Sequence, residues 1–114
     1  MDRFKFSDLD ARYRKDILDW VAPGEARDSV WELREISPKE VYTKFTQDYF
    51  WNQTDYPDDD KVKKLEKLIG KSGFTRPILI DEVHTDGPWL EGLHRTSAAY
   101  GLRLKAIPVL YRVS

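Results

Sequence analysis

A glycine turn between an expected strand and an expected helix is the feature of this sequence that most constrains its fold. Residues 89–101 (WLEGLHRTSAAYG) predict a strand end, a tight turn at Gly92 and a short helix that stops at Gly101. Glycine allows backbone conformations that are closed to other residues, and it lets a ligand approach the backbone closely. Ala98 and Ala99 are small, so this helix can lie close to a sheet. We expect the rest of the chain to hold this turn in place.

The helix that follows Gly92 is expected to begin with a cluster of hydrogen-bond donors. The start of a helix offers unpaired backbone N–H groups and a partial positive charge. The side chains of His94, Arg95, Thr96 and Ser97 add donors at the same place. This combination favours an anion, with phosphate as the preferred candidate. A helix start with solvated polar residues is the alternative, and the stretch alone does not decide between the two.

Composition limits the classes of protein to which the chain can belong. Its 114 residues, 40% hydrophobic and 34% charged, are typical of one soluble globular domain. No apolar run approaches membrane-spanning length, and the N-terminus does not resemble a signal peptide, so we expect no membrane association. The chain has no cysteine and only His84 and His94 as histidines, which excludes thiol chemistry and disfavours a zinc site. A cytoplasmic location is the expectation.

The two halves of the chain differ in charge although the net charge is only −1. Residues 1–60 carry 9 basic and 15 acidic side chains, whereas residues 61–114 carry 10 and 5. The glycine turn therefore lies in the basic half, as an anion site would prefer. The near-neutral total charge disfavours a general nucleic-acid-binding protein.

The first part of the chain predicts a helix, a strand and a second helix. Ser7 is placed to cap a helix over residues 8–21, whose apolar side is made of Leu9, Tyr13, Ile17, Trp20 and Val21. This helix either packs on the domain, which we favour, or binds a protein partner. Residues 30–36 alternate apolar and charged side chains, as a half-buried strand does. Ser37, Pro38 and Glu40 then form a strong helix start, and that helix is expected to reach residues 50–51.

The second part predicts one more helix and a set of strands. Three aspartates at residues 58–60 precede a helix over residues 61–71, with Val62, Leu65, Leu68 and Ile69 on its apolar side and Gly73 as its stop. We interpret the triple acid as a complement to the helix dipole in preference to a metal site. Residues 76–81 predict a strand, and a turn at residues 85–88 predicts that residues 89–91 return antiparallel. Residues 107–113 form the last expected strand.

Three blocks in a fixed order give the chain a resemblance to a known superfamily. They are residues 64–80 (KLEKLIGKSGFTRPILI), 91–99 (EGLHRTSAA) and 101–109 (GLRLKAIPV). They resemble the helix, glycine and Pro-Ile strand, the acidic-Gly-x-His-Arg turn and the closing Gly-Leu…Ile-Pro-Val of the ParB N-terminal / sulfiredoxin-like superfamily. The resemblance implies an α+β fold, a small mixed sheet packed with helices. It covers residues 29–114 as one domain and leaves residues 1–28 as an N-terminal helical extension.

The resemblance also implies roles for individual residues. Gly92, His94 and Arg95 would contact the phosphates of a nucleotide, and Thr96 and Ser97 would begin the helix beneath them. Glu91 would anchor Mg²⁺ or act as a base, which makes Glu91, His94 and Arg95 the candidate catalytic residues. Thr75 and Arg76 would lie on the neighbouring wall.

The chain departs from the family in ways that narrow the expected chemistry. Sulfiredoxins carry a cysteine where this chain has Leu93, so thiol-based reduction is not expected. Chromosome-partitioning ParB proteins continue into a helix-turn-helix domain, which has no counterpart here, so centromere-type DNA recognition is not expected. The arginine that often lies before the family's first helix has no match in residues 52–57. Stand-alone versions of the fold occur as nucleotide-dependent kinases, as nucleases and as small regulators in mobile elements.

Two classes of function follow, with a third ranked below them. The first is a protein that binds an NTP (ATP or CTP) with Mg²⁺ and hydrolyses it or transfers a phosphoryl group, as an NTPase or phosphotransferase. The second is a non-catalytic interaction or inhibitor protein of the phage or plasmid type, with the N-terminal helix facing its partner. A DNA-binding protein or nuclease is the third. The nucleotide base and the phosphoryl acceptor stay open.

Overall fold

A computed structural model describes residues 2–43, 59–74, 76–84 and 88–114 of the chain. The fold is α+β, with helices and a five-stranded sheet in the strand order β1-β2-β5-β3-β4. The strands are β1 Arg3–Lys5, β2 Val30–Ile36, β3 Ile78–Asp81, β4 Trp89–Glu91 and β5 Ile107–Arg112. The helices are the 3₁₀ turn η1 Phe6–Asp8 and α1 Ala11–Trp20, α2 Pro23–Arg27, α3 Pro38–Thr43, α4 Asp59–Ser72 and α5 Leu93–Gly101.

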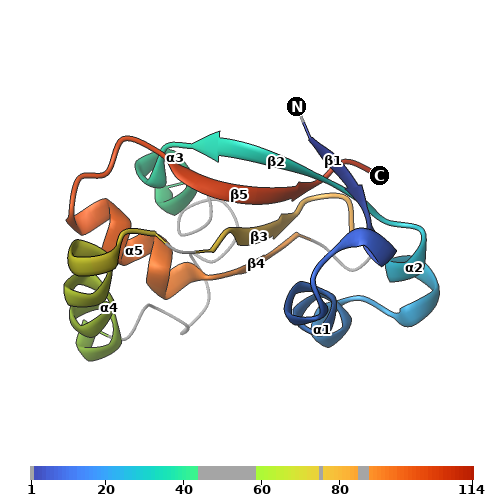
Figure 1. The fold of residues 1–114 in the computed structure, drawn as a ribbon, viewed down its shortest axis with the longest axis horizontal. Helices are drawn as coiled ribbons and strands as arrows, with labels where there is room; N and C mark the ends of the chain where they lie inside the picture. The colour runs from blue at the N-terminus through green and yellow to red at the C-terminus, as the bar shows by residue number, and fades with distance from the viewer. Residues whose placement is uncertain (1, 44–58, 75, 85–87) are drawn as a thin grey trace. The chain divides into compact units, whose positions relative to one another are not determined.

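The sheet is mixed. β1 pairs antiparallel with β2, and β3 pairs antiparallel with β4 in a register that places Ile80 opposite Leu90. Figure 1 shows β3 and β5 running in the same direction and β2 running against them. The predicted strands over residues 30–36, 76–81, 89–91 and 107–113 are confirmed within two residues at each end.

The described residues form two compact units. Unit 1 comprises Met1–Arg34, Leu79–Glu91 and Val109–Ser114, and unit 2 comprises Glu35–Ile78 and Gly92–Pro108. Residues 1–28, expected as a helical extension, supply β1, α1 and α2 to unit 1. The same unit also contains strand segments from far along the sequence. The division into an extension and a single domain stays a prediction.

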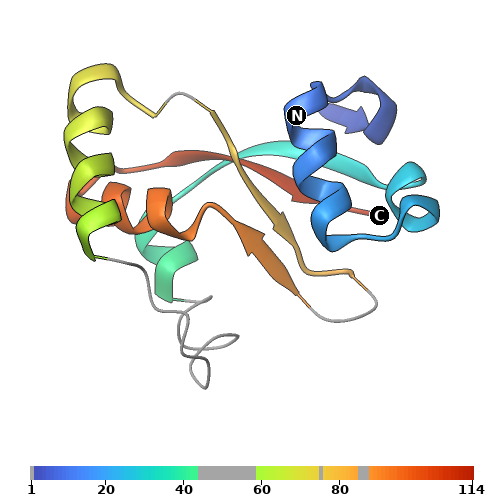
Figure 2. The same ribbon diagram turned by 90° about the horizontal axis from the view of Figure 1, so that it is seen from below.

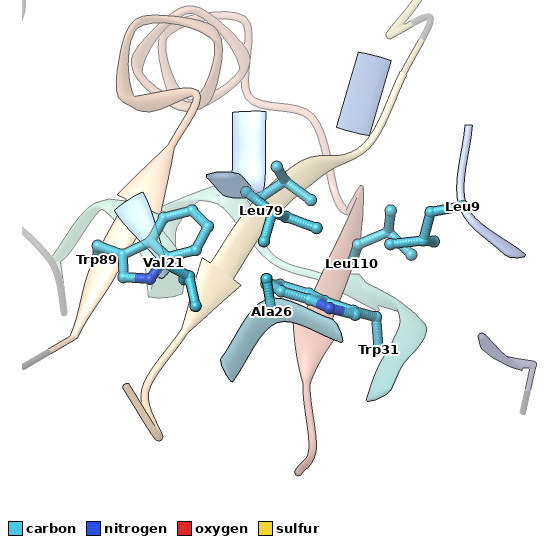
Figure 3. Close-up of a cluster of buried hydrophobic side chains, with 8 residues drawn as sticks. Leu9, Val21, Ala26, Trp31, Leu79, Trp89 and Leu110 are labelled. Atoms are coloured by element: carbon cyan, nitrogen blue, oxygen red, sulfur yellow. The ribbon is translucent and has the colours of Figure 1, made fainter. Parts of the chain in front are cut away.

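The core of unit 1 is built around two tryptophans. Trp31 on β2 is fully buried, and its ring lies 6.0 Å from that of Trp89 on β4. Figure 3 shows the cluster, in which these rings meet aliphatic side chains from the helices and from neighbouring strands. The buried members are Leu9, Ile17, Val21, Ala26, Trp31, Leu79, Trp89 and Leu110.

The first helix differs from its prediction in two respects. It begins after Asp10, whose carboxylate accepts a hydrogen bond of 2.9 Å from the backbone N–H of Arg12, and not after Ser7. Ser7 lies instead in η1. Leu9, Ile17 and Val21 are buried as expected, but Leu9 lies before the helix and Val21 is its C-cap. The prediction is wrong for Trp20, whose side chain is exposed and stacks at 5.7 Å on Trp89.

A chain of polar groups lies in the interior of unit 1. The carboxylate of Asp81 is fully buried and accepts hydrogen bonds from Trp89 Nε1 at 3.0 Å and Arg112 Nη1 at 2.9 Å. Arg112 also lies 3.5 Å from Glu25, whose other carboxylate oxygen is 3.3 Å from His84 Nε2. Buried charge is tolerated there because each of these groups has partners.

Unit 2 is helical, and α5 packs against both α3 and α4. Figure 2 shows α4 alongside α5. Tyr42 of α3 contacts Tyr100 near the end of α5, with 5.1 Å between the ring centres. The predicted start of α3 at Pro38 is confirmed, and so is the end of α4 at Gly73, which has a φ of 77° and donates to the Ile69 carbonyl. The predicted end of the α3 helix near residues 50–51 lies outside the described residues. On α4, Ile69 is buried as expected, whereas Leu68 is 60% exposed.

Candidate functional site

The turn at Gly92 has the conformation that the sequence predicts. Gly92 has a φ of 112° and forms the N-cap of α5 without any side-chain cap. A Cβ atom there would lie 2.6 Å from Cγ2 of Ile78 and 3.0 Å from Nη2 of Arg95. Glycine is therefore required both by the left-handed backbone and by the close approach of these two side chains. The sequence analysis suggested that Gly92 is small so that a ligand can approach it closely. In the structure, Ile78 and Arg95 occupy the space next to Gly92.

Thr96 stabilises the turn through two hydrogen bonds to Gly92. Its backbone N–H and its hydroxyl both donate to the Gly92 carbonyl at 2.9 Å, and the side chain is fully buried. The hydroxyl predicted to sit beneath a phosphate therefore stabilises the turn. Its backbone amide is likewise engaged within the first turn of α5.

Arg95 links the first turn of α5 to the segment that leads into β3. Its Nη1 donates to the carbonyl of Arg76 at 2.9 Å and to that of Pro77 at 3.4 Å. The guanidinium carbon lies 5.8 Å from the centre of the Phe74 ring. The structure thus brings together Arg95 and Arg76, which were predicted on neighbouring walls. Thr75, predicted beside them, lies outside the described residues.

A pocket of about 260 Å³ opens beside the two arginines. Arg76 and Arg95 form its cationic part, and most of the remaining wall is apolar. The other lining residues are Leu65, Leu68, Ile69, Ser72, Gly73 and Phe74. The sequence did not assign the α4 residues to a site, because the apolar side of this helix was interpreted as buried, and the exposure of Leu68 is visible only in the structure. The turn, both arginines and this pocket all belong to unit 2.

The other predicted residues are placed by the elements that carry them. His94 is half-buried in the first turn of α5. Ser97 lies one turn further along, and its Oγ is buried without a hydrogen-bond partner among the described residues. Glu91 is the half-buried last residue of β4, opposite Leu79, and belongs to unit 1.

Electrostatics at the start of α5 favour an anion. The N-terminus of a helix carries roughly half a positive charge, which falls off within the first turn. α5 has no acidic residue in its first turn to offset that charge. Arg76 adds a full positive charge at the pocket wall, and no ion pair of its side chain is recorded in the described part of the chain. An anionic group in the pocket would therefore meet favourable charge from Arg76.

The described residues suit a metal ion less well than they suit an anion. Over the described ranges, no three side chains of the His, Cys, Asp and Glu types gather in a way that could hold a metal ion. Mg²⁺ typically keeps one or two carboxylates and completes its shell with phosphate oxygens and water. Glu91 is the carboxylate that the sequence assigns to this role, and a magnesium ion would depend mainly on a bound nucleotide.

Comparison with known proteins gave no match to a family model, to a curated protein or to a solved structure. The resemblance to the ParB N-terminal / sulfiredoxin-like superfamily therefore stays a prediction from the three sequence blocks. Within the part of the chain that the structure describes, no helix has both the length and the apolar character needed to cross a membrane.

Proposed function

We propose that the pocket beside Arg76 and Arg95 binds a nucleotide. The observation that carries this proposal is the combination of an apolar wall from α4 with two guanidinium groups in one pocket. A nucleotide has the matching halves, because its base presents an apolar face and its phosphates carry charge. Arginine suits phosphate because its planar group donates several hydrogen bonds at once.

In this proposal the base and sugar lie against Leu65, Leu68 and Phe74, and the phosphates extend past Arg76 toward the start of α5. The pocket volume of about 260 Å³ is close to the lower end of the range for small-molecule sites, roughly 300–1,000 Å³. It therefore holds one end of the nucleotide, and the other end lies over the surface. Arg95 acts mainly as a positioning residue, since its Nη1 fixes the segment that carries Arg76.

Phosphoryl transfer is the further step that this proposal allows. Such reactions depend mostly on positioning and charge neutralisation, so few residues are needed. His94, in the first turn of α5, would help to neutralise phosphate charge. The role that the resemblance implies for Glu91, as Mg²⁺ anchor or base, stays a prediction, because Glu91 belongs to unit 1. ATP and CTP are the first nucleotides to examine.

Thermal unfolding with ATP, CTP and GTP, each with and without Mg²⁺, tests the proposal. A nucleotide at 100 times its Kd stabilises the folded state by about 2.7 kcal/mol. For a domain of this size that corresponds to a rise in Tm of about 10 °C. Phosphate release measured in the same samples reports whether the bound nucleotide is hydrolysed. If none of the three nucleotides raises Tm, the proposal is overturned.

Two variants separate pocket binding from general charge effects. Arg76→Ala removes a cation from the pocket wall, and Leu68→Asp places a carboxylate on its exposed apolar rim. Both should abolish the nucleotide-induced rise in Tm while leaving the unliganded protein folded. Lys63→Ala on the exposed side of α4 is the control, because Lys63 does not line the pocket. Equal loss of binding in the control would contradict the assignment.

A further inference from the structure

A second and larger pocket lies in unit 2, away from the residues assigned above. It has a volume of about 630 Å³ and is open at the surface. One side is the start of α3, and the other is the segment that leads from the end of α5 toward β5. It shares no lining residue with the pocket beside Arg76.

Three cations converge on this pocket from two parts of the chain. Lys39 comes from α3, and Arg103 and Lys105 come from the segment after α5. All three are exposed, and none has an ion pair recorded among the residues that the structure describes. Among the described residues that line the pocket, none is acidic, and the carboxylate of Glu66 on α4 lies next to Gly101 at its edge. The C-terminus of α5 contributes roughly half a negative charge, so the positive charge is in excess.

Arg103 adopts a backbone conformation that is unfavourable for a residue with a side chain. It has a φ of 58°, in the left-handed region that favours glycine. It follows the end of α5, where its N–H donates to the Tyr100 carbonyl at 3.0 Å, and glycine is the common residue at such helix ends. An arginine in this conformation costs more than glycine would. Its charge complements the negative end of the α5 dipole and is also available to an anion in the pocket.

Tyr100 adds a flat aromatic surface to the same pocket. Tyr100 is the next-to-last residue of α5, and its side chain is 41% exposed. The ring is held at 5.1 Å from the ring of Tyr42 on α3, with 38° between their planes. A partly exposed ring that is fixed from one side is suited to stacking on a nucleobase.

We propose that this pocket binds single-stranded nucleic acid. Lys39, Arg103 and Lys105 contact successive phosphates, and one unstacked base lies on Tyr100. Cationic grooves combined with aromatic side chains are the common means of binding single strands without sequence preference. The near-neutral charge of the whole chain disfavours a protein that coats nucleic acid, so the proposal is limited to this local cluster of cations. A duplex fits less well because its bases are already stacked on one another. DNA and RNA share the phosphates and bases, so the experiment compares both.

Fluorescence anisotropy with labelled oligothymidylate and oligouridylate of about 12 nucleotides, within the usual site size, tests this proposal. Three phosphate contacts on a single strand predict a slope of about −2 for log K against log salt concentration. The variant Lys39→Glu/Lys105→Glu should reduce the size of that slope by about 1.4 and weaken binding at low salt by at least tenfold. Tyr100→Leu should weaken binding by roughly tenfold and leave the slope unchanged.

The matched control is Lys63→Glu/Lys67→Glu, which makes the same change in net charge on exposed positions of α4. It should retain the affinity and the slope of the unmodified chain. Circular dichroism melting confirms that each variant is folded, and Tyr100→Phe keeps the ring and should keep the affinity.

Four results would overturn the proposal. They are no binding of either oligonucleotide at about 50 mM salt, equal loss in the control pair, tighter binding of a duplex of the same length, and binding of anionic lipid vesicles through Lys39 and Lys105 in place of oligonucleotides. None of these outcomes depends on the nucleotide pocket, because the two pockets have different residues and their variants are separate.

Discussion

Asp81 and Arg112 form a buried ion pair across 31 positions of sequence, with 2.9 Å between Oδ2 and Nη1. The Asp81 side chain is fully buried, and its second oxygen accepts the backbone N–H of Val83 at 3.0 Å. Arg112 also donates through Nε to the Ser114 carbonyl. The pair therefore links β3 to the end of the chain within unit 1, and its two charges depend on each other.

Loss of the arginine should destabilise the fold strongly. Arg112→Met leaves the Asp81 carboxylate buried without its cation, and breaking such a pair costs about 3–5 kcal/mol. Urea unfolding should show this loss as a lower midpoint. The double variant Arg112→Met/Asp81→Asn should recover part of it, since no unpaired charge remains at Asp81. Arg27→Met, at an exposed position of α2, is the control and should change the free energy of unfolding by less than about 0.5 kcal/mol.

Gly92 should tolerate no side chain. Gly92→Ala forces an L-residue to a φ of 112° and places its Cβ 2.6 Å from Ile78. The left-handed backbone alone costs roughly 1–2 kcal/mol, and the clash adds to it. Gly70→Ala is the matched comparison in the same unit, because Gly70 lies in α4 with nothing within 4 Å of an added Cβ. That change should stabilise the protein by up to about 1 kcal/mol. Opposite signs in thermal unfolding are the expected result, and a neutral Gly92→Ala would contradict the conformation of the turn.

The local backbone signals were predictable from sequence because they depend on neighbours in the chain. Pro38 fixes φ at a helix start, whereas Gly73 at a helix end and Gly92 in a tight turn permit the positive φ found there. The pairing of β1 with β2 was not predictable in the same way, since β1 has only three residues and its alternation is too short to indicate a strand. The polar interior of unit 1 depends on Arg112 meeting Asp81, and no local pattern records a contact between residues so far apart.

In the candidate site, too, some features were predictable from the sequence and others were not. The resemblance placed Arg76 near Arg95, and the two do lie together. The apolar wall from α4 was not predicted, because Leu68 was interpreted as part of a buried face. Thr96 and Arg95 were interpreted as part of a phosphate site from their side-chain donors and from the resemblance. Their bonds to the Gly92 and Arg76 carbonyls are visible only when the chain is folded.

Acid should weaken unit 1 through Glu32. Hydrogen bonds from Arg34 at 2.8 Å and from Arg3 at 3.0 Å lower the pKa of this carboxyl below its ordinary value of 4.5. A pKa that is lower in the folded state than in the unfolded state contributes stability that is present above the unfolded value and is lost as pH falls through the folded one. Stability measured by urea unfolding should therefore decline below about pH 4.5.

The variant Glu32→Gln isolates that contribution. It should lower stability at neutral pH and make the decline in acid shallower. Glu35→Gln, which removes an exposed carboxylate from the same strand, should leave the decline as in the unmodified chain. If both variants gave the same acid profile, Glu32 would not be its source.

The start of α1 gives a direct comparison between two capping candidates. The structure assigns the cap to Asp10, whose carboxylate accepts from Arg12 N–H, and gives Ser7 no such bond. Asp10→Ala should therefore cost about 1 kcal/mol, because it removes both a hydrogen bond and a negative charge at the helix N-terminus. Ser7→Ala, at an exposed position, should change stability by less than about 0.5 kcal/mol. Thermal unfolding of the two variants measures the difference. A larger loss for Ser7→Ala would mean that the helix begins where the sequence pattern first suggested, with the capping hydroxyl three residues earlier.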